Sequence, residues 1–154
     1  MFKHLLVPLD GSGFAEAALP YALELAAQFD SEITLLRVIT PPRLGEGTLT
    51  PESANFTIRI RDDLYKEAIE YLQFQKGSLR SQNYRAHYQV VEAEDVAAEI
   101  ISTVRGIDAD TVVMCTHGRG GLGRWLFGSV ATRVLQSAVV PVLVIRPQGA
   151  AAAA

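Results

Sequence analysis

The sequence has a single cysteine, Cys115, in 154 residues, so no disulfide can form within the chain. A cytoplasmic location is therefore the expected one. The N-terminus lacks the apolar core and the cleavage site of a signal peptide, and no apolar run approaches the roughly 20 residues needed to cross a bilayer. The 14 basic residues are fewer than the 17 acidic ones, which gives a formal net charge of −3. We therefore expect neither a membrane nor a nucleic acid as a partner.

The composition is typical of a folded globular domain, with 49% hydrophobic and 20% charged residues. The length fits one domain, which we predict to occupy residues 1–147. Residues 148–154 are rich in alanine and are interpreted as a flexible tail or a remnant of cloning.

Short apolar runs alternate along the chain with segments of helical periodicity. The runs predict strands over 5–9, 33–39, 84–91, 111–116 and 139–145, and the periodic segments predict helices over 14–29, 57–81, 96–104 and 129–137. Asp95 is the expected N-cap of the third helix, and residues 40–55 are expected to be a loop. Alternating strands and helices predict a parallel sheet covered on both faces, with ligands bound beyond the carboxyl ends of its strands.

The most informative segment runs from residue 112 to residue 129, where a strand leads through a glycine-rich, basic turn into a helix. Glycine backbone and a helix N-terminus together favour an anion such as phosphate. The pattern Gly118-x-Gly120-x-x-Gly123 matches a dinucleotide fingerprint, but it follows the fourth strand and no acidic residue follows at the expected distance. Gly123 to Ser129 resembles a Walker A loop without its lysine. A merely flexible loop is the alternative interpretation.

The spacing Gly118-x9-Gly128-Ser129 resembles the nucleotide loop of the universal stress protein family, whose ATP-binding members carry Gly-x2-Gly-x9-Gly-Ser/Thr. Cys115 stands at the position of the first glycine. Residues 4–12 resemble the family's first strand and acidic loop, and residues 140–145 resemble its last strand. The resemblance implies a three-layer, doubly wound α/β fold of the flavodoxin or Rossmann type, with a five-stranded parallel sheet in the order 3-2-1-4-5.

The resemblance also implies that ATP binds, together with Mg²⁺. Asp10 would lie near the ribose or adenine, Val38 would contact the adenine, and Gly128 and Ser129 would help to hold the phosphates. The full set of expected nucleotide-binding residues is Pro8, Leu9, Asp10, Val38, Met114, Cys115, His117, Gly118, Arg119, Gly121, Gly128, Ser129 and Val130. For Asp10 and Ser129 the alternatives are a turn residue and a plain helix cap, and for Arg119 a solvated loop charge. No protein ligands for a metal are expected.

Pro141 cannot donate a hydrogen bond to a neighbouring strand, so the strand predicted over Val139–Ile145 should lie at a sheet edge. An apolar, uncharged edge favours pairing with another chain. In the family this strand pairs across a twofold axis, and the resemblance therefore implies a homodimer.

The leading hypothesis is an ATP-binding universal stress protein that acts as a sensor or regulator in the stress response. Any ATP hydrolysis should be slow, because the lysine of a phosphate loop and a catalytic base are missing, and no catalytic residue is assigned. One alternative is a family member that binds no nucleotide and serves as a dimeric interaction module. Another is a nucleotide hydrolase that uses His117 with Asp10.

Overall fold

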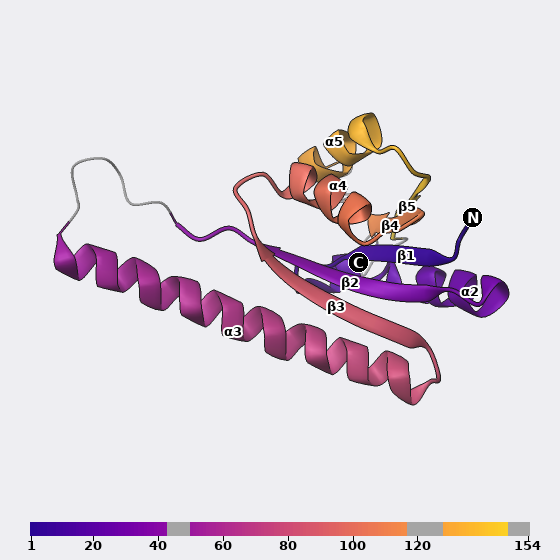
Figure 1. Ribbon diagram of the computed structural model, residues 1–154, viewed down its shortest axis with the longest axis horizontal. Coiled ribbons are helices and arrows are strands. Elements are labelled where there is room, and N and C mark those ends of the chain that lie inside the picture. The colour runs from indigo at the N-terminus through magenta and orange to yellow at the C-terminus, as the bar shows by residue number, and fades with distance from the viewer. Residues whose placement is uncertain (43–49, 117–127, 148–154) are drawn as a thin grey trace, which may run out of the picture.

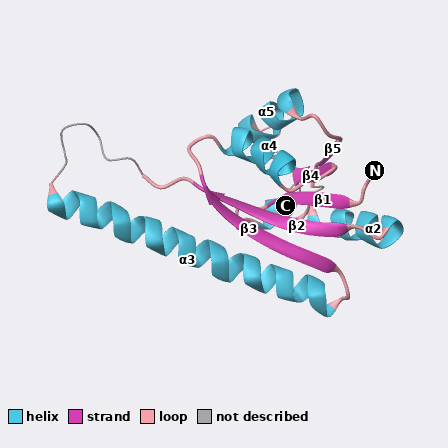
Figure 2. Ribbon diagram, in the orientation of Figure 1, coloured by secondary structure: helices cyan, strands magenta, loops and turns pink. Residues whose placement is uncertain are grey.

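The computed structural model describes residues 1–42, 50–116 and 128–147. Its sheet has five strands, all parallel, in the order β3-β2-β1-β4-β5 (Figures 1 and 2). The predicted fold class and strand order are thereby confirmed. The strands are β1 (His4–Pro8), β2 (Glu32–Ile39), β3 (Arg85–Glu92), β4 (Thr111–Cys115) and β5 (Val142–Ile145).

Two layers of helices cover the two faces of the sheet, as Figure 1 shows. The helices are α1 (Gly13–Glu16), α2 (Leu19–Phe29), α3 (Pro51–Ser81), α4 (Val96–Gly106) and α5 (Ser129–Ser137). On one face, Ala22 of α2 and Leu72 of α3 pack with Leu35 of the sheet in a buried cluster. On the other face, Ile100 of α4 and Val134 of α5 pack with Leu36. Alternation along β2 thus sends Leu35 and Leu36 into separate cores.

The helix predicted over 14–29 is wrong as a single element, because it is divided into α1 and α2. Pro20 stands in the first turn of α2, where its missing N–H is tolerated. In one continuous helix its ring would clash with the carbonyl of Glu16, which is the last residue of α1. Ser12 caps the start of α1, with its hydroxyl accepting from the Ala15 N–H at 3.2 Å.

Two other predicted boundaries differ from the structure by three residues or more. α3 begins at Pro51 rather than residue 57, because Thr50 and Ser53 form a capping box within the stretch predicted as loop. β5 begins at Val142 rather than Val139, and Val139 is 66% exposed. The Pro141 carbonyl accepts from the Val112 N–H at 3.0 Å, but Pro141 has no N–H to donate, and the first residue pair with β4 is Val142 with Val112. The edge position predicted for this strand is confirmed.

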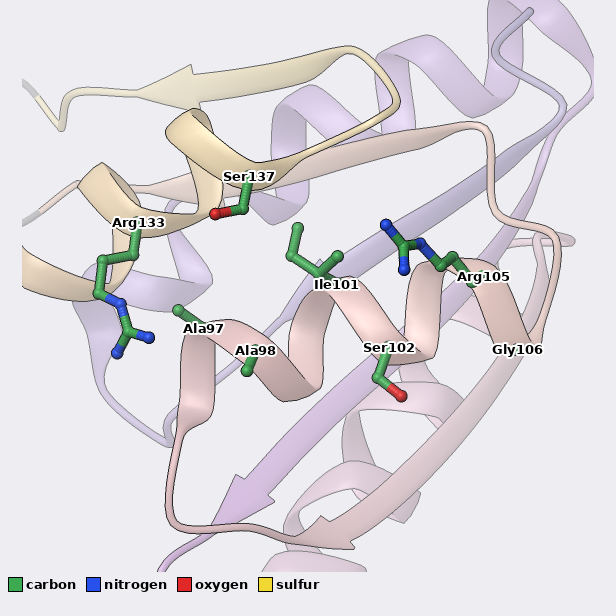
Figure 3. Close-up of a pocket in the computed structure, with 8 residues that line it drawn as sticks. All are labelled: Ala97, Ala98, Ile101, Ser102, Arg105, Gly106, Arg133 and Ser137. Atoms are coloured by element: carbon green, nitrogen blue, oxygen red, sulfur yellow. The ribbon is translucent and has the colours of Figure 1, made fainter.

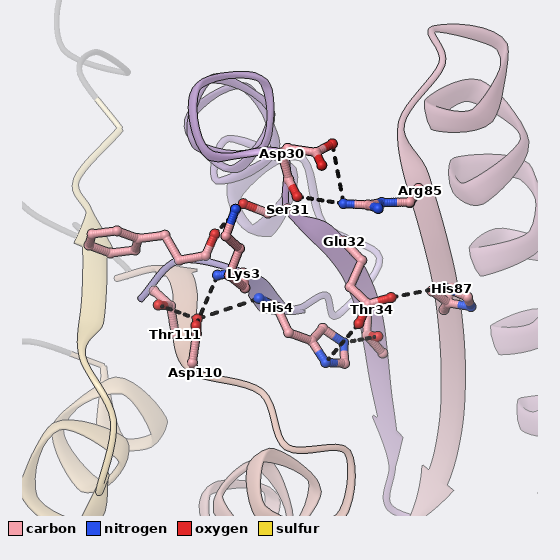
Figure 4. A network of polar contacts seen from close by, with 11 residues as sticks. Lys3, His4, Asp30, Ser31, Glu32, Thr34, Arg85, His87, Asp110 and Thr111 are labelled. Atoms are coloured by element: carbon pink, nitrogen blue, oxygen red, sulfur yellow. Dashed lines mark hydrogen bonds and ion pairs between the residues drawn. The ribbon is translucent and has the colours of Figure 1, made fainter.

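A network of polar side chains closes the amino ends of the strands (Figure 4). Asp110, just before β4, accepts from the backbone N–H of Lys3 at 2.9 Å and from the Thr111 hydroxyl at 3.0 Å. Glu32 lies between two imidazoles, with His4 Nδ1 and His87 Nε2 each 3.5 Å from one of its oxygens. These groups join four adjacent strands, β3, β2, β1 and β4, at the amino ends of the strands.

Candidate functional site

A cavity of about 300 Å³ lies at the carboxyl ends of the strands, beside the start of α5. Residues of β1, β2 and β4 form its floor, and α4 and α5 supply one wall. β1 and β4 are neighbours in the sheet although they are far apart in sequence, so their carboxyl ends mark the switch point of the topology. The fold therefore places this cavity where parallel α/β sheets generally bind ligands.

The cavity brings together nine of the residues predicted to bind a nucleotide. They are Pro8, Leu9, Asp10, Val38, Met114, Cys115, Gly128, Ser129 and Val130. The other four, His117, Gly118, Arg119 and Gly121, lie outside the described residues. The geometry shows which side chains share one cavity, and their contacts with a nucleotide remain a prediction.

Five further residues line the cavity that motif spacing did not indicate: Ala15, Leu36, Val96, Ile100 and Ala131. Two of them had a signal in the sequence. Val96 and Ile100 are four residues apart on α4, and the same spacing that predicted a buried helical stripe also turns them toward the site. Leu36 is two residues before Val38 on β2, so both side chains leave the same face of the sheet. The cavity wall is accordingly mostly aliphatic.

The turn after β1 carries the main acidic group of the site. The N–H of Leu9 donates to the Leu36 carbonyl at 2.8 Å, which extends the pairing with β2 beyond the end of the strand. One oxygen of Asp10 then accepts from both the backbone N–H (2.9 Å) and the hydroxyl (2.5 Å) of Ser12. Gly11 between them has φ +83°, a conformation that glycine adopts without strain. Asp10 is thus both a turn residue and part of the cavity lining.

The start of α5 borders the site beside α4. Gly128 is the N-cap of this helix, so Ser129 is its first residue rather than its cap. No side chain in the described part of the chain caps α5, and the Gly128 N–H is directed instead to the hydroxyl of Thr116 at 3.3 Å. The N–H groups of the first turn carry the positive end of the helix dipole, and in this arrangement they border the cavity. This edge of the site is suited to an anion.

Cys115 lines the cavity as a neutral thiol. Burial and the negative charge of Asp10 raise the pKa of Cys115 to about 11. Little thiolate is then present near neutral pH, which disfavours a role as nucleophile. The aliphatic side chains of α4 and β2 make another part of the cavity lining apolar. An apolar surface and a helix N-terminus in one cavity suit a ligand with a flat apolar part and an anionic part.

Other features of the described residues offer less for a ligand. A hollow of about 590 Å³ lies between α4 and α5, with Arg105 and Arg133 at its sides and Ile101 between them (Figure 3). None of the predicted site residues lines it. Within the described ranges, no group of histidine, cysteine, aspartate and glutamate side chains could hold a metal ion. No helix of these ranges is long and apolar enough to cross a membrane.

The chain is similar in sequence and in fold to known proteins. The model of the universal stress protein family matches residues 1–146. Universal stress protein MJ0531 of Methanocaldococcus jannaschii is 32% identical over 147 residues, which cover 95% of this chain and 83% of the relative. A solved structure of the protein MJ0577 superposes with a TM-score of 0.78 and 26% identity, covering 97% of this chain and 99% of the other. A universal stress protein from Archaeoglobus fulgidus, solved in complex with dAMP, superposes with a TM-score of 0.64 and 22% identity, covering 93% and 97%.

The fold and the position of the cavity define a doubly wound α/β protein with a site at the switch point of its sheet. The match over residues 1–146 assigns it further: the chain belongs to the universal stress protein family. The resemblance seen in the glycine loop and in the two end strands is therefore confirmed at the level of the family.

Proposed function

We propose that this protein binds ATP, with its Mg²⁺, in the cavity at the carboxyl ends of β1, β2 and β4. The observation that carries the proposal is the convergence of Asp10, Val38 and the start of α5 on one cavity. A volume of about 300 Å³ is within the range of small-molecule sites. The dAMP complex of the A. fulgidus relative supports an adenine nucleotide as the class of ligand.

The two sides of the cavity match the two ends of such a ligand. Val38, Val96 and Ile100 offer an aliphatic surface for the adenine ring. The Asp10 carboxylate can accept hydrogen bonds from ribose hydroxyls. The uncapped first turn of α5, at Gly128 and Ser129, favours the negatively charged phosphates. Mg²⁺ would be held by the phosphates, since the described residues offer it no cluster of carboxylates.

The proposed biological role is that of a nucleotide-dependent regulator in the stress response, with slow ATP hydrolysis at most and a cytoplasmic location. The outer edge of β5 is proposed to pair with the same edge of a second copy. Leu143 on this strand is 38% exposed and Val139 just before it is 66% exposed, so apolar side chains flank the open edge. Together they provide an apolar surface that a homodimer would cover.

The experiment combines mass spectrometry of nucleotide released on denaturation with calorimetry of ATP and Mg²⁺ binding to nucleotide-free protein. The wild type should bind ATP. Val38→Trp should abolish binding because the indole fills the cavity, and Ile58→Trp is the matched control, since Ile58 on α3 is 53% exposed and outside the cavity. Failure of the wild type to release or bind any adenine nucleotide would overturn the proposal. So would equal binding by the Val38→Trp variant.

A further inference from the structure

The guanidinium of Arg37, on β2, lies next to the turn that carries Asp10. Its neighbours Leu36 and Val38 both line the cavity, so alternation along the strand directs Arg37 to the other face of the sheet. A Cβ atom built on Gly11 would be 3.6 Å from one terminal nitrogen of the Arg37 guanidinium and 3.8 Å from the other. The guanidinium therefore packs against the backbone of the turn on the side away from the cavity.

Side chains of α1 and α3 form a polar cluster on this face of the sheet. The Tyr71 hydroxyl of α3 donates to Glu16 of α1 at 2.9 Å, and Gln75 donates to the same oxygen at 3.1 Å. Burial and the bond to Glu16 raise the pKa of Tyr71. The negative charge of Asp10 raises it further, and the positive charge of Arg37 lowers it. The charges of Arg37 and Asp10 are thus both close enough to act on one hydroxyl.

The presence of a cation at this position is not explained by packing. Arg37 Nε is buried and has no hydrogen-bond partner among the described residues. A buried donor without a partner is unfavourable, and an aliphatic side chain could fill the same space without that penalty. An aliphatic side chain would not supply the flat, charged group that packs against the Gly11 backbone, next to Asp10 in the turn.

We propose that Arg37 is a positioning residue that holds the Asp10–Gly11–Ser12 turn and thereby orients the Asp10 carboxylate toward the ligand. This inference rests on the proposed function, because it needs Asp10 to contact the bound nucleotide. Arg37 acts through Asp10 and is not in the lining of the cavity. Its loss should therefore affect binding only as far as Asp10 contributes to binding.

The test is a double-mutant cycle on ATP affinity, measured by calorimetry with Arg37→Gln, Asp10→Asn and the double variant. Each single change should weaken ATP binding by roughly tenfold. The double variant should bind about as weakly as either single one, because both changes remove the contact of the Asp10 carboxylate with the ligand. Arg37→Lys keeps the charge without the flat fork and should recover part of the affinity. Arg59→Gln, on the exposed surface of α3, is the control and should bind like the wild type.

Thermal unfolding of each variant separates positioning from folding. Arg37→Gln is expected to unfold near the wild-type temperature, and Arg37→Lys serves for the comparison if Arg37→Gln does not fold. Unchanged ATP affinity in the Arg37 variants would overturn the inference. So would losses that multiply in the double variant, which would mean independent effects. An absence of ATP binding in the wild type would instead overturn the proposed function and this inference with it.

Discussion

Arg133 of α5 donates a hydrogen bond to the carboxylate of Asp95, the residue that caps α4. The other oxygen of this carboxylate accepts from the Ala98 N–H at 3.1 Å, so one side chain both begins α4 and joins it to α5. Val96 and Val130, each one turn or less from this pair along its own helix, line the candidate site. The contact between the two residues therefore joins the two helices of one cavity wall at its exposed edge.

Asp95→Ala should lower the thermal unfolding temperature more than Arg133→Ala does. The first change removes the helix cap together with the ion pair, whereas the second removes the ion pair alone and leaves the cap. Circular dichroism melts at low and high salt provide the measurement. High salt should reduce the effect of Arg133→Ala and leave much of the effect of Asp95→Ala. Equal losses in the two variants would show that the cap contributes little.

Acid should remove a stabilising contribution of Asp110. Burial by itself would raise the pKa of Asp110, but hydrogen bonds from the Lys3 N–H and the Thr111 hydroxyl outweigh it and hold the pKa below its usual value. A carboxylate whose pKa is lowered in the folded state stabilises the fold at pH values above its unfolded pKa of about 4. This stabilisation is lost as the pH falls through the pKa of the folded state. The stability difference between wild type and Asp110→Asn should therefore shrink between about pH 5 and pH 2 in urea titrations. A difference that does not vary with pH would contradict this assignment.

Cys115 should react slowly with iodoacetamide. With a pKa of about 11, its thiolate fraction at pH 8 gives a rate on the order of a hundredfold below that of a free thiol, before any steric protection. The rate should rise tenfold per pH unit above pH 8, and Asp10→Asn should increase it because a negative charge near the thiol is lost. Mass spectrometry of the labelled protein follows the reaction. Fast labelling at pH 7 would mean that the thiol is neither buried nor close to Asp10.

Leu143→Arg should convert the proposed homodimer to a monomer. The substitution places a charge on the exposed edge of β5, where a second copy would have to bury it. Light scattering coupled to size-exclusion chromatography gives the mass directly. Phe74→Arg is the matched control, since Phe74 is 74% exposed on α3, away from that edge. A monomeric wild type, or a Leu143→Arg variant that remains dimeric, would contradict the proposed interface.

The parts of the fold that follow from periodicity were predicted well, and those that depend on contacts were not. The bounds of α5 were predicted correctly because apolar spacing and the preceding Gly128 mark both the helix and its start. The break before α2 was not predicted, because Pro20 also lies near the beginning of a helix over 14–29, where a proline is better tolerated than in a helix interior. The start of α3 was not predicted, because Thr50 and Pro51 follow a stretch rich in proline and glycine that is typical of a loop. The capping box of Thr50 and Ser53 was therefore not recognised as a helix start.

The candidate site shows the same division. Asp10, Val38 and Ser129 were predicted from the resemblance to the universal stress protein family. They line one cavity because the carboxyl ends of parallel strands meet at one edge of the sheet. Ala15 and Ala131 were not predicted, because their place in the cavity depends on how α1 and α5 pack. Arg37 carried no motif at all. Only the left-handed turn at Gly11 and the guanidinium beneath it distinguish this side chain.

The length of α3 has a consequence for how the molecule opens. Its buried side chains are Ala68, Leu72 and Leu79, all in the second half, and the first half extends past the sheet in Figure 1. A bond from Arg61 to Glu92 of β3, at 2.6 Å, attaches this first half to the end of the sheet. Helical segments with few buried contacts unravel without unfolding the core. Amide protons before Arg61 should therefore exchange with deuterium long before those around Leu72, and a protease should cut there first while the sheet stays intact.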